Sequence, residues 1–334
     1  MSTETSTTVV ASLALAALLM VVAVIALLAG PAEIGLGEVF TALRGGGDDV
    51  VRAIVVEIRL PRLLLGALVG ATLGASGAVL QALFRNPLAE PGVIGVSSSA
   101  ALGAVLVLYL GAASYTEVWL PLSAMGMAIL AMGLLLAVVM TQASMLTLIL
   151  AGVILNSFAA ALTALALNLS PNPFAYNDIM FWLMGSVANR SFEDILLILP
   201  FLVLGLGMMG VALRPLRATV LPDEAAASLG VNLKLTRSLV IAGVAFSVGA
   251  SVAVAGVIGF VGLIAPHMVR PLVGHDPARV FIPSALAGAA LLVGADVLIR
   301  WLPGGASLRL GVVTALLGAP FFFYYLMASR RAMP

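Results

Sequence analysis

Long apolar stretches separated by short polar breaks dominate the chain. Ten of them are candidates for membrane helices, at 9–29, about 63–84, and near 93–110, 118–140, 145–168, 192–213, 236–256, 258–271, 279–299 and 308–327. A helix needs about 20 mostly apolar residues to cross the hydrocarbon core of a bilayer. The breaks fall where Pro, Gly and charged residues gather, at 85–92, 170–190, 214–234 and 274–279. The pattern predicts an all-α, polytopic membrane protein with about ten transmembrane helices.

Two stretches need separate comment. The first, 9–29, is too long for the core of a signal peptide, so we expect a retained span. The stretch at 258–271 is short and Gly-rich with Pro266 inside it, and we expect it to cross the membrane only in part. Between the first two spans, residues 31–58 read as a polar interlude.

Composition excludes several classes of protein. Hydrophobic residues make up 62% of the 334 residues and charged residues only 9%, so too little polar side chain is present to cover a soluble globule. There is no Cys, which excludes disulfides and thiolate metal sites, and only two His remain as material for a metal centre. We therefore predict no metal site and no resident cofactor. A net charge of only +1 argues against a nucleic-acid partner.

The second span carries a pattern of small residues. Gly66, Gly70 and Gly74 recur every four residues, a spacing that lets helix backbones approach closely. Gly74-Ala75-Ser76-Gly77 is also similar to the nucleophile motif of rhomboid intramembrane proteases, which would need His267 as base. Serine in a membrane helix usually bonds its own backbone. Helix packing is therefore the preferred interpretation, and the protease stays an alternative.

The chain contains few groups that could couple transport to an energy source. An ion-coupled secondary transporter usually needs a buried carboxylate relay. Asp296 lies four residues before Arg300 on the same helix face, which predicts an ion pair instead. A Walker A loop needs Gly-Lys-Ser/Thr, whereas the one lysine, Lys234, lies between two leucines. The chain is therefore not expected to be an enzyme, and ATP-driven transport would require a separate ATPase subunit.

Six motifs, in order along nearly the whole chain, resemble the FecCD family. They are RLPR at 59–62, QALFRNPLAEPG at 81–92, FWLMGS at 181–186, ASLGV at 227–231, the segment 256–270, and GVVTALLGAPFF at 311–322. The family comprises permease subunits of binding-protein-dependent ABC importers for iron chelates and vitamin B12. The resemblance implies a type II ABC importer permease fold over residues 1–334 as a single transmembrane domain, with a cytoplasmic coupling loop at about 214–234.

The resemblance also implies an assembly and a location. Two permease copies, expected as a homodimer, would pair above two ATPase subunits that bind ATP and Mg, and below a periplasmic binding protein. The chain would be a multi-pass protein of the bacterial inner membrane, with both termini cytoplasmic. Charge alone does not decide this orientation.

By the same resemblance, three sets of residues are expected to carry function. Arg59, Arg62 and Arg300 would dock the binding protein, because guanidinium groups form bidentate pairs with carboxylates. A short helix would contact the ATPase through Asp223, Glu224, Ala227, Ser228, Leu229 and Gly230, with Asp223 as N-cap and Gly230 as terminator. A cytoplasmic gate would involve Asn86, Pro87, Leu88, Met145 and Leu146.

The ligand is less well specified. Met145 and Leu146 are apolar where the vitamin B12 permease has small hydroxyl residues, which favours an iron chelate, such as a ferric siderophore or haem, over cobalamin. Arg309 adds a positive charge near the outer mouth, which suits an anionic ligand. Cobalamin remains the alternative substrate, and an ion-coupled carrier remains the alternative class.

Overall fold

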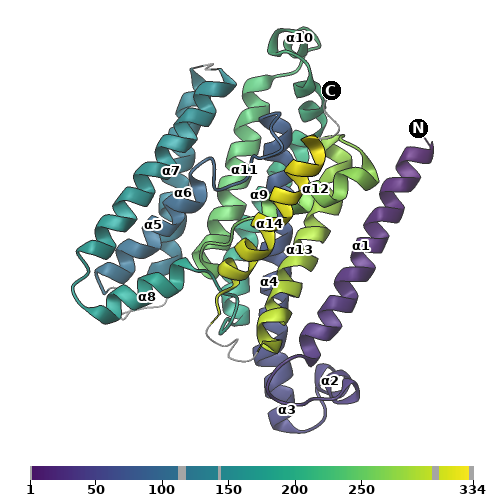
Figure 1. The fold of residues 1–334 in the computed structure, drawn as a ribbon, viewed down its shortest axis with the longest axis vertical. Helices are drawn as coiled ribbons and strands as arrows, with labels where there is room; N and C mark the ends of the chain where they lie inside the picture. Colours follow the sequence, from purple (N-terminus) through teal and green to yellow (C-terminus); the bar gives the residue numbers. More distant parts are fainter. Residues whose placement is uncertain (1, 112–117, 142–143, 303–307, 331–334) are drawn as a thin grey trace.

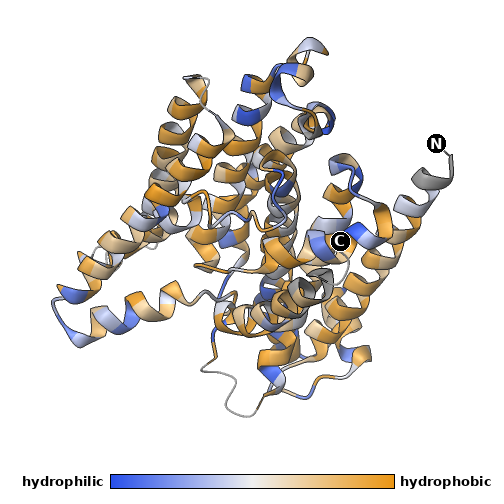
Figure 2. Cartoon of the chain, turned by 45° about the horizontal axis from the view of Figure 1, so that its top comes forward, coloured by the Kyte–Doolittle hydropathy of each residue, from blue (hydrophilic) through white to orange (hydrophobic). Residues whose placement is uncertain are grey.

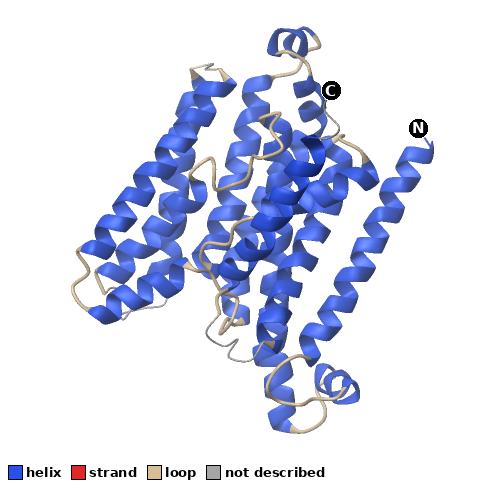
Figure 3. Cartoon of the chain, viewed as in Figure 1, coloured by secondary structure: helices blue, strands red, loops and turns tan. Residues whose placement is uncertain are grey.

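The computed structural model describes residues 2–111, 118–141, 144–302 and 308–330, and in this part of the chain the regular elements are all helical (Figures 1 and 3). In chain order they are α1 Ser2–Leu28, α2 Leu36–Leu43, α3 Asp49–Ala53, the π-helical η1 Ile54–Arg59, α4 Leu60–Leu83, α5 Val96–Tyr109, α6 Trp119–Met140, α7 Met145–Asn168, α8 Pro173–Leu183, α9 Phe192–Leu216, the 3₁₀ turn η3 Arg217–Val220, α10 Asp223–Ser228, α11 Leu233–Ala255, α12 Val261–Val273, α13 Pro277–Trp301 and α14 Leu310–Arg330.

The predicted membrane helices correspond to observed ones. Seven helices among the described residues are long and apolar enough to cross a bilayer, and the three shorter apolar helices α5, α12 and α14 account for the other predicted spans. With 13 residues, α12 is about 20 Å long at 1.5 Å per residue, which is less than the hydrocarbon thickness. The expectation that this segment crosses only in part is consistent with that length.

Two segments predicted as polar breaks contain helix. Residues 31–58 hold α2, α3 and η1, and α3 continues through the π turn into α4, so one helical stretch runs from Asp49 to Leu83. Segment 170–190 holds α8, which Asn172 caps by accepting a hydrogen bond from the Ala175 amide at 2.9 Å. Charged and polar residues suggested breaks here, yet some of them start helices, as Asp48 does by accepting hydrogen bonds from the amides of Val50 and Val51.

The predicted glycine contact lies at the centre of the molecule, between α4 and α13. A Cβ atom on Gly70 would lie 2.4 Å from the carbonyl oxygen of Gly288, and one on Gly74 would lie 2.1 Å from that of Ser284. Such distances leave no room for any side chain. The every-fourth glycine pattern therefore brings two helix backbones into direct contact, as its spacing predicts.

Helices differ in how much of their apolar surface is covered. Most of α4, α11 and α13 is buried, whereas α1 and α7 leave long apolar faces exposed. Hydrophobic residues run along the long helices, and hydrophilic ones gather at helix ends and connections (Figure 2). Exposed apolar faces with polar ends are the arrangement that a bilayer requires, because lipid solvates apolar side chains.

The two ends of the bundle carry different elements. The short helix α10 lies at one end, together with the start of α1 and the end of α14, while α2 and α3 lie at the other (Figure 1). We call these the α10 end and the α2–α3 end. The predicted coupling loop, 214–234, comprises the end of α9, η3, α10 and the start of α11, all near the α10 end.

Candidate functional site

Helix α10 ends at the predicted residue but begins differently from the prediction. Pro222 occupies the N-cap, so the prediction of Asp223 as N-cap is wrong, and Asp223 is the first helical residue. Gly230 adopts a φ of +82°. Its amide donates to the Ala227 carbonyl at 2.9 Å, and the Val231 amide donates to Ala226 at 3.2 Å, which is a Schellman termination. The prediction of Gly230 as helix terminator is confirmed.

Asp223 holds α10 to the bundle instead of capping it. Its carboxylate accepts a hydrogen bond from the Arg237 guanidinium of α11 at 2.6 Å, and Arg85 approaches at 3.4 Å from the end of α4. A carboxylate in the first helical turn also complements the positive end of the helix dipole. One aspartate thus ties together α10 and the ends of two membrane helices. Sequence reasoning missed Arg85 and Arg237, because neither belongs to the local pattern of the helix.

Arg85 has an unusual backbone that directs it toward this segment. It takes a φ of +48° just after α4, where the Asn86 amide donates to the Gln81 carbonyl at 3.2 Å. The Arg85 guanidinium also donates to the carbonyls of Thr219 and Leu221. Non-glycine residues rarely adopt this conformation, and where they do the surrounding contacts must stabilise it. The end of α4 is therefore joined rigidly to the chain that leads into α10.

The predicted gate and the predicted coupling helix share a cavity of about 680 Å³. Met145 and Leu146, at the start of α7, line it together with Arg85, Asp223 and Glu224. Asn86, Pro87 and Leu88 form the exposed turn beside it, where Asn86 Oδ1 accepts a hydrogen bond from the Leu88 amide at 2.9 Å. The start of α7 and the start of α10 therefore face the same cavity.

The outer face of α10 is free for another protein. Within the helix only Ala226 is buried. All the predicted coupling residues are exposed: Asp223, Glu224, Ala227, Ser228, Leu229 and Gly230. Leu229 is 68% exposed although it is fully apolar. A helix this short is marginally stable alone, and here ion pairs hold it in place. The arrangement therefore holds the apolar side chain of Leu229 in a fixed position at the surface.

The three arginines predicted to dock a binding protein lie together at the α2–α3 end. Arg62 forms a bidentate pair with Asp296: its Nη2 donates to Oδ1 at 2.7 Å and its Nε donates to Oδ2 at 3.0 Å. Arg300 pairs with the same carboxylate at 3.0 Å, which confirms the predicted ion pair. Asp296 is buried, and guanidinium groups from α4 and α13 both pair with its carboxylate.

Arg59 and Arg300 also perform a structural task that sequence reasoning missed. The last carbonyls of a helix have no partner within the helix. Arg59 donates to the carbonyls of Leu27 at 2.6 Å, Leu28 at 3.0 Å and Ala32 at 2.7 Å. Arg300 donates to those of Ala26 at 2.8 Å and Ala29 at 3.1 Å. The two arginines therefore cap the C-terminus of α1. Arg59 is 4% exposed, so its role in docking stays a prediction.

Replacing Arg59 by alanine is expected to lower the thermal stability of the detergent-solubilised protein. Three carbonyls near the end of α1 lose their donor, at a cost of roughly 1–3 kcal/mol for each group left buried without a partner. Arg52→Ala is the matched control, because Arg52 is exposed and pairs only with neighbouring residues of its own segment. Thermal unfolding curves compare the two. Equal melting temperatures for both variants would contradict the capping role.

Comparison with known proteins places this geometry in a family. The model of the FecCD transport family matches residues 18–328. The chain is 39% identical over 314 residues to the vitamin B12 import system permease protein BtuC of Klebsiella pneumoniae, covering 94% of this chain and 92% of that one. It is 38% identical over 295 residues to the uncharacterised ABC transporter permease protein YvrB of Bacillus subtilis, covering 86% and 82%.

A solved structure agrees with these relatives. It is an inward-facing conformation of an ABC transporter provisionally typed as a metal-chelate transporter, and it superimposes with a TM-score of 0.85. Its sequence is 34% identical, and the match covers 95% of this chain and 98% of that one. The family model spans nearly the whole chain, and sequence and structure lead to the same assignment. The chain belongs to the FecCD transport family and is a multi-pass permease of an ABC importer.

Proposed function

We propose that this chain carries a metal chelate inward across the bacterial inner membrane, as one of two identical permease subunits. A periplasmic binding protein delivers the chelate, and two separate ATPase subunits supply the energy and hold ATP and Mg. The observation that supports this best is α10, an exposed helix tied through Asp223 to the ends of α4 and α11. In this proposal the α10 end and both chain termini are cytoplasmic.

The proposed mechanism is a rigid-body push on α10. When the ATPase pair closes, it moves Leu229 and the rest of the exposed face. The ion pairs of Asp223 with Arg85 and Arg237 pass this movement to α4 and α11, since charge-assisted hydrogen bonds hold their geometry well. Met145 and Leu146 border the same cavity and follow. These two apolar side chains form a gate that binds the solute only weakly. Weak binding suits release, because tight binding on the path would slow release.

Docking of the binding protein is proposed at the α2–α3 end. Arg62 is the most accessible of the three arginines there, with a side chain 20% exposed, against 9% for Arg300. The cluster holds three guanidinium groups and one carboxylate, so it keeps an excess of positive charge. Positive potential of this kind steers an acidic partner surface toward its docking position.

We propose an iron chelate as the substrate, with cobalamin as the second candidate. The apolar gate at Met145 and Leu146 supports a ferric siderophore or haem. The similarity to vitamin B12 permeases supports cobalamin. Both are bulky organic molecules that carry a metal, and the solved structure of the metal-chelate type is compatible with either.

The alternative classes receive no support from the positions of their key residues. Ser76, the nucleophile of a protease, is fully buried, and its hydroxyl lies 3.8 Å from the sulfur of Met209. Asp296, which an ion-coupled carrier would use as a relay, is held by Arg62 and Arg300. Neither group has the accessibility that its proposed chemistry requires.

Reconstitution into proteoliposomes tests the proposed function. We expect uptake of a ferric siderophore, haem or cobalamin only when the ATPase, ATP and the loaded binding protein are all present, because the chain has no nucleotide-binding motif of its own. The same vesicles with a proton or sodium gradient but without ATP are the control. If this chain, without its partner subunits, took up substrate with only the ion gradient present, the proposal would be overturned. The three substrates assayed in parallel separate iron chelate from cobalamin.

A further inference from the structure

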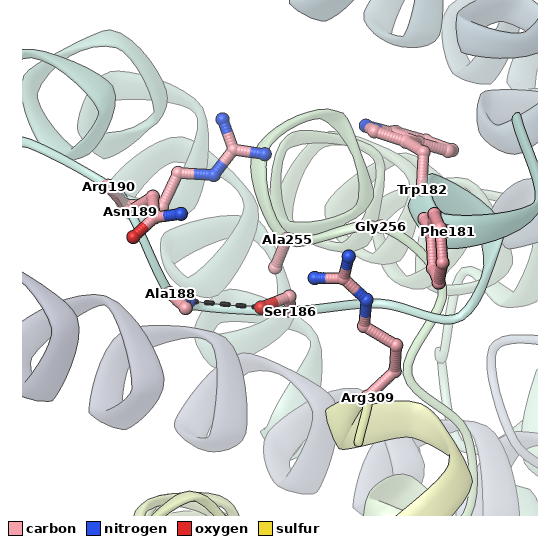
Figure 4. A pocket seen from close by; sticks show the side chains of 9 residues that line it. All are labelled: Phe181, Trp182, Ser186, Ala188, Asn189, Arg190, Ala255, Gly256 and Arg309. Atoms are coloured by element: carbon pink, nitrogen blue, oxygen red, sulfur yellow. Dashed lines mark hydrogen bonds between the residues drawn. The ribbon is translucent and has the colours of Figure 1, made fainter. Parts of the chain in front are cut away.

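A small polar pocket of about 280 Å³ lies where α8, α11 and α14 meet (Figure 4). Phe181 and Trp182 come from the end of α8, Ser186 and Arg190 from the loop that follows, and Arg309 from just before α14. We call it the Arg190–Arg309 pocket. None of its nine described lining residues is acidic.

The backbone around the pocket is firmly held. The Ser186 amide donates to the Ala255 carbonyl of α11 at 2.7 Å. The Leu310 amide donates to Gly185 at 3.0 Å, and the Gly311 amide donates to Met184 at 3.0 Å. These bonds join the loop after α8 to both α11 and α14. The pocket is therefore a built feature of the fold and not a gap in a loose loop.

The two arginines in this pocket have few acceptors among the described residues. Their Nε atoms are enclosed by protein and have no hydrogen-bond acceptor there. Arg190 reaches Asp194 only through Nη1, at 3.7 Å, and the Arg309 guanidinium lies 4.8 Å from the centre of the Phe181 ring. In Figure 4 the Arg190 and Arg309 side chains enter the pocket from different segments, one on each side of Ser186. The Nη groups at the ends of the two side chains are the donors that a group in the pocket can reach, and positive charge with so little pairing favours an anionic acceptor.

The chemistry of a group that fits the pocket follows from these donors. The two guanidinium groups offer only donors, and Asp194 offsets one of their two positive charges. Anionic oxygens, as in a carboxylate or phosphate, satisfy such a set best, since guanidinium binds them through charge-assisted bonds. The aromatic rings of Phe181 and Trp182 suit the organic body that carries the group. A volume of about 280 Å³ admits one such group and not a whole chelate.

We propose that the Arg190–Arg309 pocket receives an anionic carboxylate or phosphate group of the transported solute. This inference rests on the proposed function and narrows it: the solute carries at least one free anionic oxygen group. The pocket would hold that group while the rest of the solute lies against the neighbouring aromatic surface.

Direct binding of simple anions tests the pocket without a binding protein. We expect the wild-type permease–ATPase complex in nanodiscs to bind citrate and inorganic phosphate, measured by isothermal titration calorimetry. Arg309→Gln and Arg190→Gln should each weaken binding at least tenfold, and Arg309→Lys should retain part of it because the charge is kept. Arg52→Gln is the control, since Arg52 is exposed and pairs with Asp49 outside the pocket. Thermal unfolding confirms that each variant is folded.

Several outcomes would overturn the inference. Failure of the wild-type complex to bind either anion would do so, as would equal affinity in the wild type and the two glutamine variants. A loss of docking of the unloaded binding protein, with anion binding unchanged, would show that the pocket receives a protein carboxylate. ATP-driven uptake is measured on the same complexes. If the wild-type complex takes up substrate normally but binds no anion, the anion-binding role of the pocket is rejected and the proposed function stands. If ATP-driven uptake is absent, the proposed function itself is rejected.

Discussion

Replacing Leu229 by aspartate is expected to abolish ATP-driven uptake while the permease remains folded. The side chain is 68% exposed at the end of α10, so the substitution costs the isolated permease little. In the assembled transporter the same side chain is proposed to lie in a cleft of the ATPase. An aspartate there would lose its hydration without a partner, which is costly. We expect association with the ATPase to weaken at least tenfold, or about 1.4 kcal/mol.

Copurification of the ATPase, ATP hydrolysis and uptake measure this effect together. Val50→Asp is the matched control, because Val50 is apolar, 66% exposed and located on α3 at the α2–α3 end. It should assemble with the ATPase as the wild type does. Unchanged assembly and uptake in Leu229→Asp would reject α10 as the coupling element. Equal loss of assembly in both variants would show a general sensitivity to charge instead of a local contact.

Substituting Gly74 by valine is expected to prevent stable folding of the bundle. The first added carbon alone would lie 2.1 Å from the carbonyl oxygen of Ser284, and backbone cannot move aside as a flexible side chain can. Helices α4 and α13 would have to separate along their central contact. Overpacking in a well-filled interior costs typically 1–3 kcal/mol, and a clash with backbone belongs to the upper end of that range or above it. Expression level, the monodisperse fraction in gel filtration and thermal unfolding measure the outcome.

Gly133→Val provides the comparison within the same protein. Gly133 lies inside α6, and nothing approaches the position of its Cβ within 4 Å. The substitution also removes a glycine from a helix interior, where glycine is unfavourable. This variant should fold as the wild type does. A stable Gly74→Val protein, or equal damage from both variants, would contradict the close α4–α13 contact.

Much of the helical architecture could be predicted because it depends on local composition. The ten apolar stretches correspond to observed helices, and the spacing of Gly70 and Gly74 correctly indicated a close contact. The continuous helix from Asp49 to Leu83 was missed, since charged residues such as Glu57 and Arg59 resemble a loop in a membrane protein. Arg59 stays helical because its guanidinium reaches carbonyls about 30 residues earlier in the chain. No local pattern reports that partner.

The candidate site also combines features that the sequence predicted with contacts that it did not predict. The end of α10 at Gly230 was predictable, because a glycine with positive φ after a short helix is a local requirement. The partners of Asp223 were not, since Arg237 and Arg85 lie 14 and 138 residues away. The Arg190–Arg309 pocket likewise joins residues from two separate segments. Arg309 alone indicated positive charge, whereas its position beside Arg190 appears only when the segments are packed together.

The sequence alone determined that this protein folds in a lipid bilayer. It also determined the number and approximate places of the apolar helices and the family to which the motifs belong. These properties follow from hydrophobicity and from short-range backbone preferences, which adjacent residues set. Apart from the Asp296–Arg300 pair, which the spacing of four residues predicted, only the tertiary structure decided which charged groups meet. It assigned Arg59 and Arg300 to the end of α1, Arg62 to Asp296 and Arg85 to the coupling helix. In a low-dielectric interior every buried charge needs a partner, and the identity of that partner depends on distances in space that the order of residues does not state.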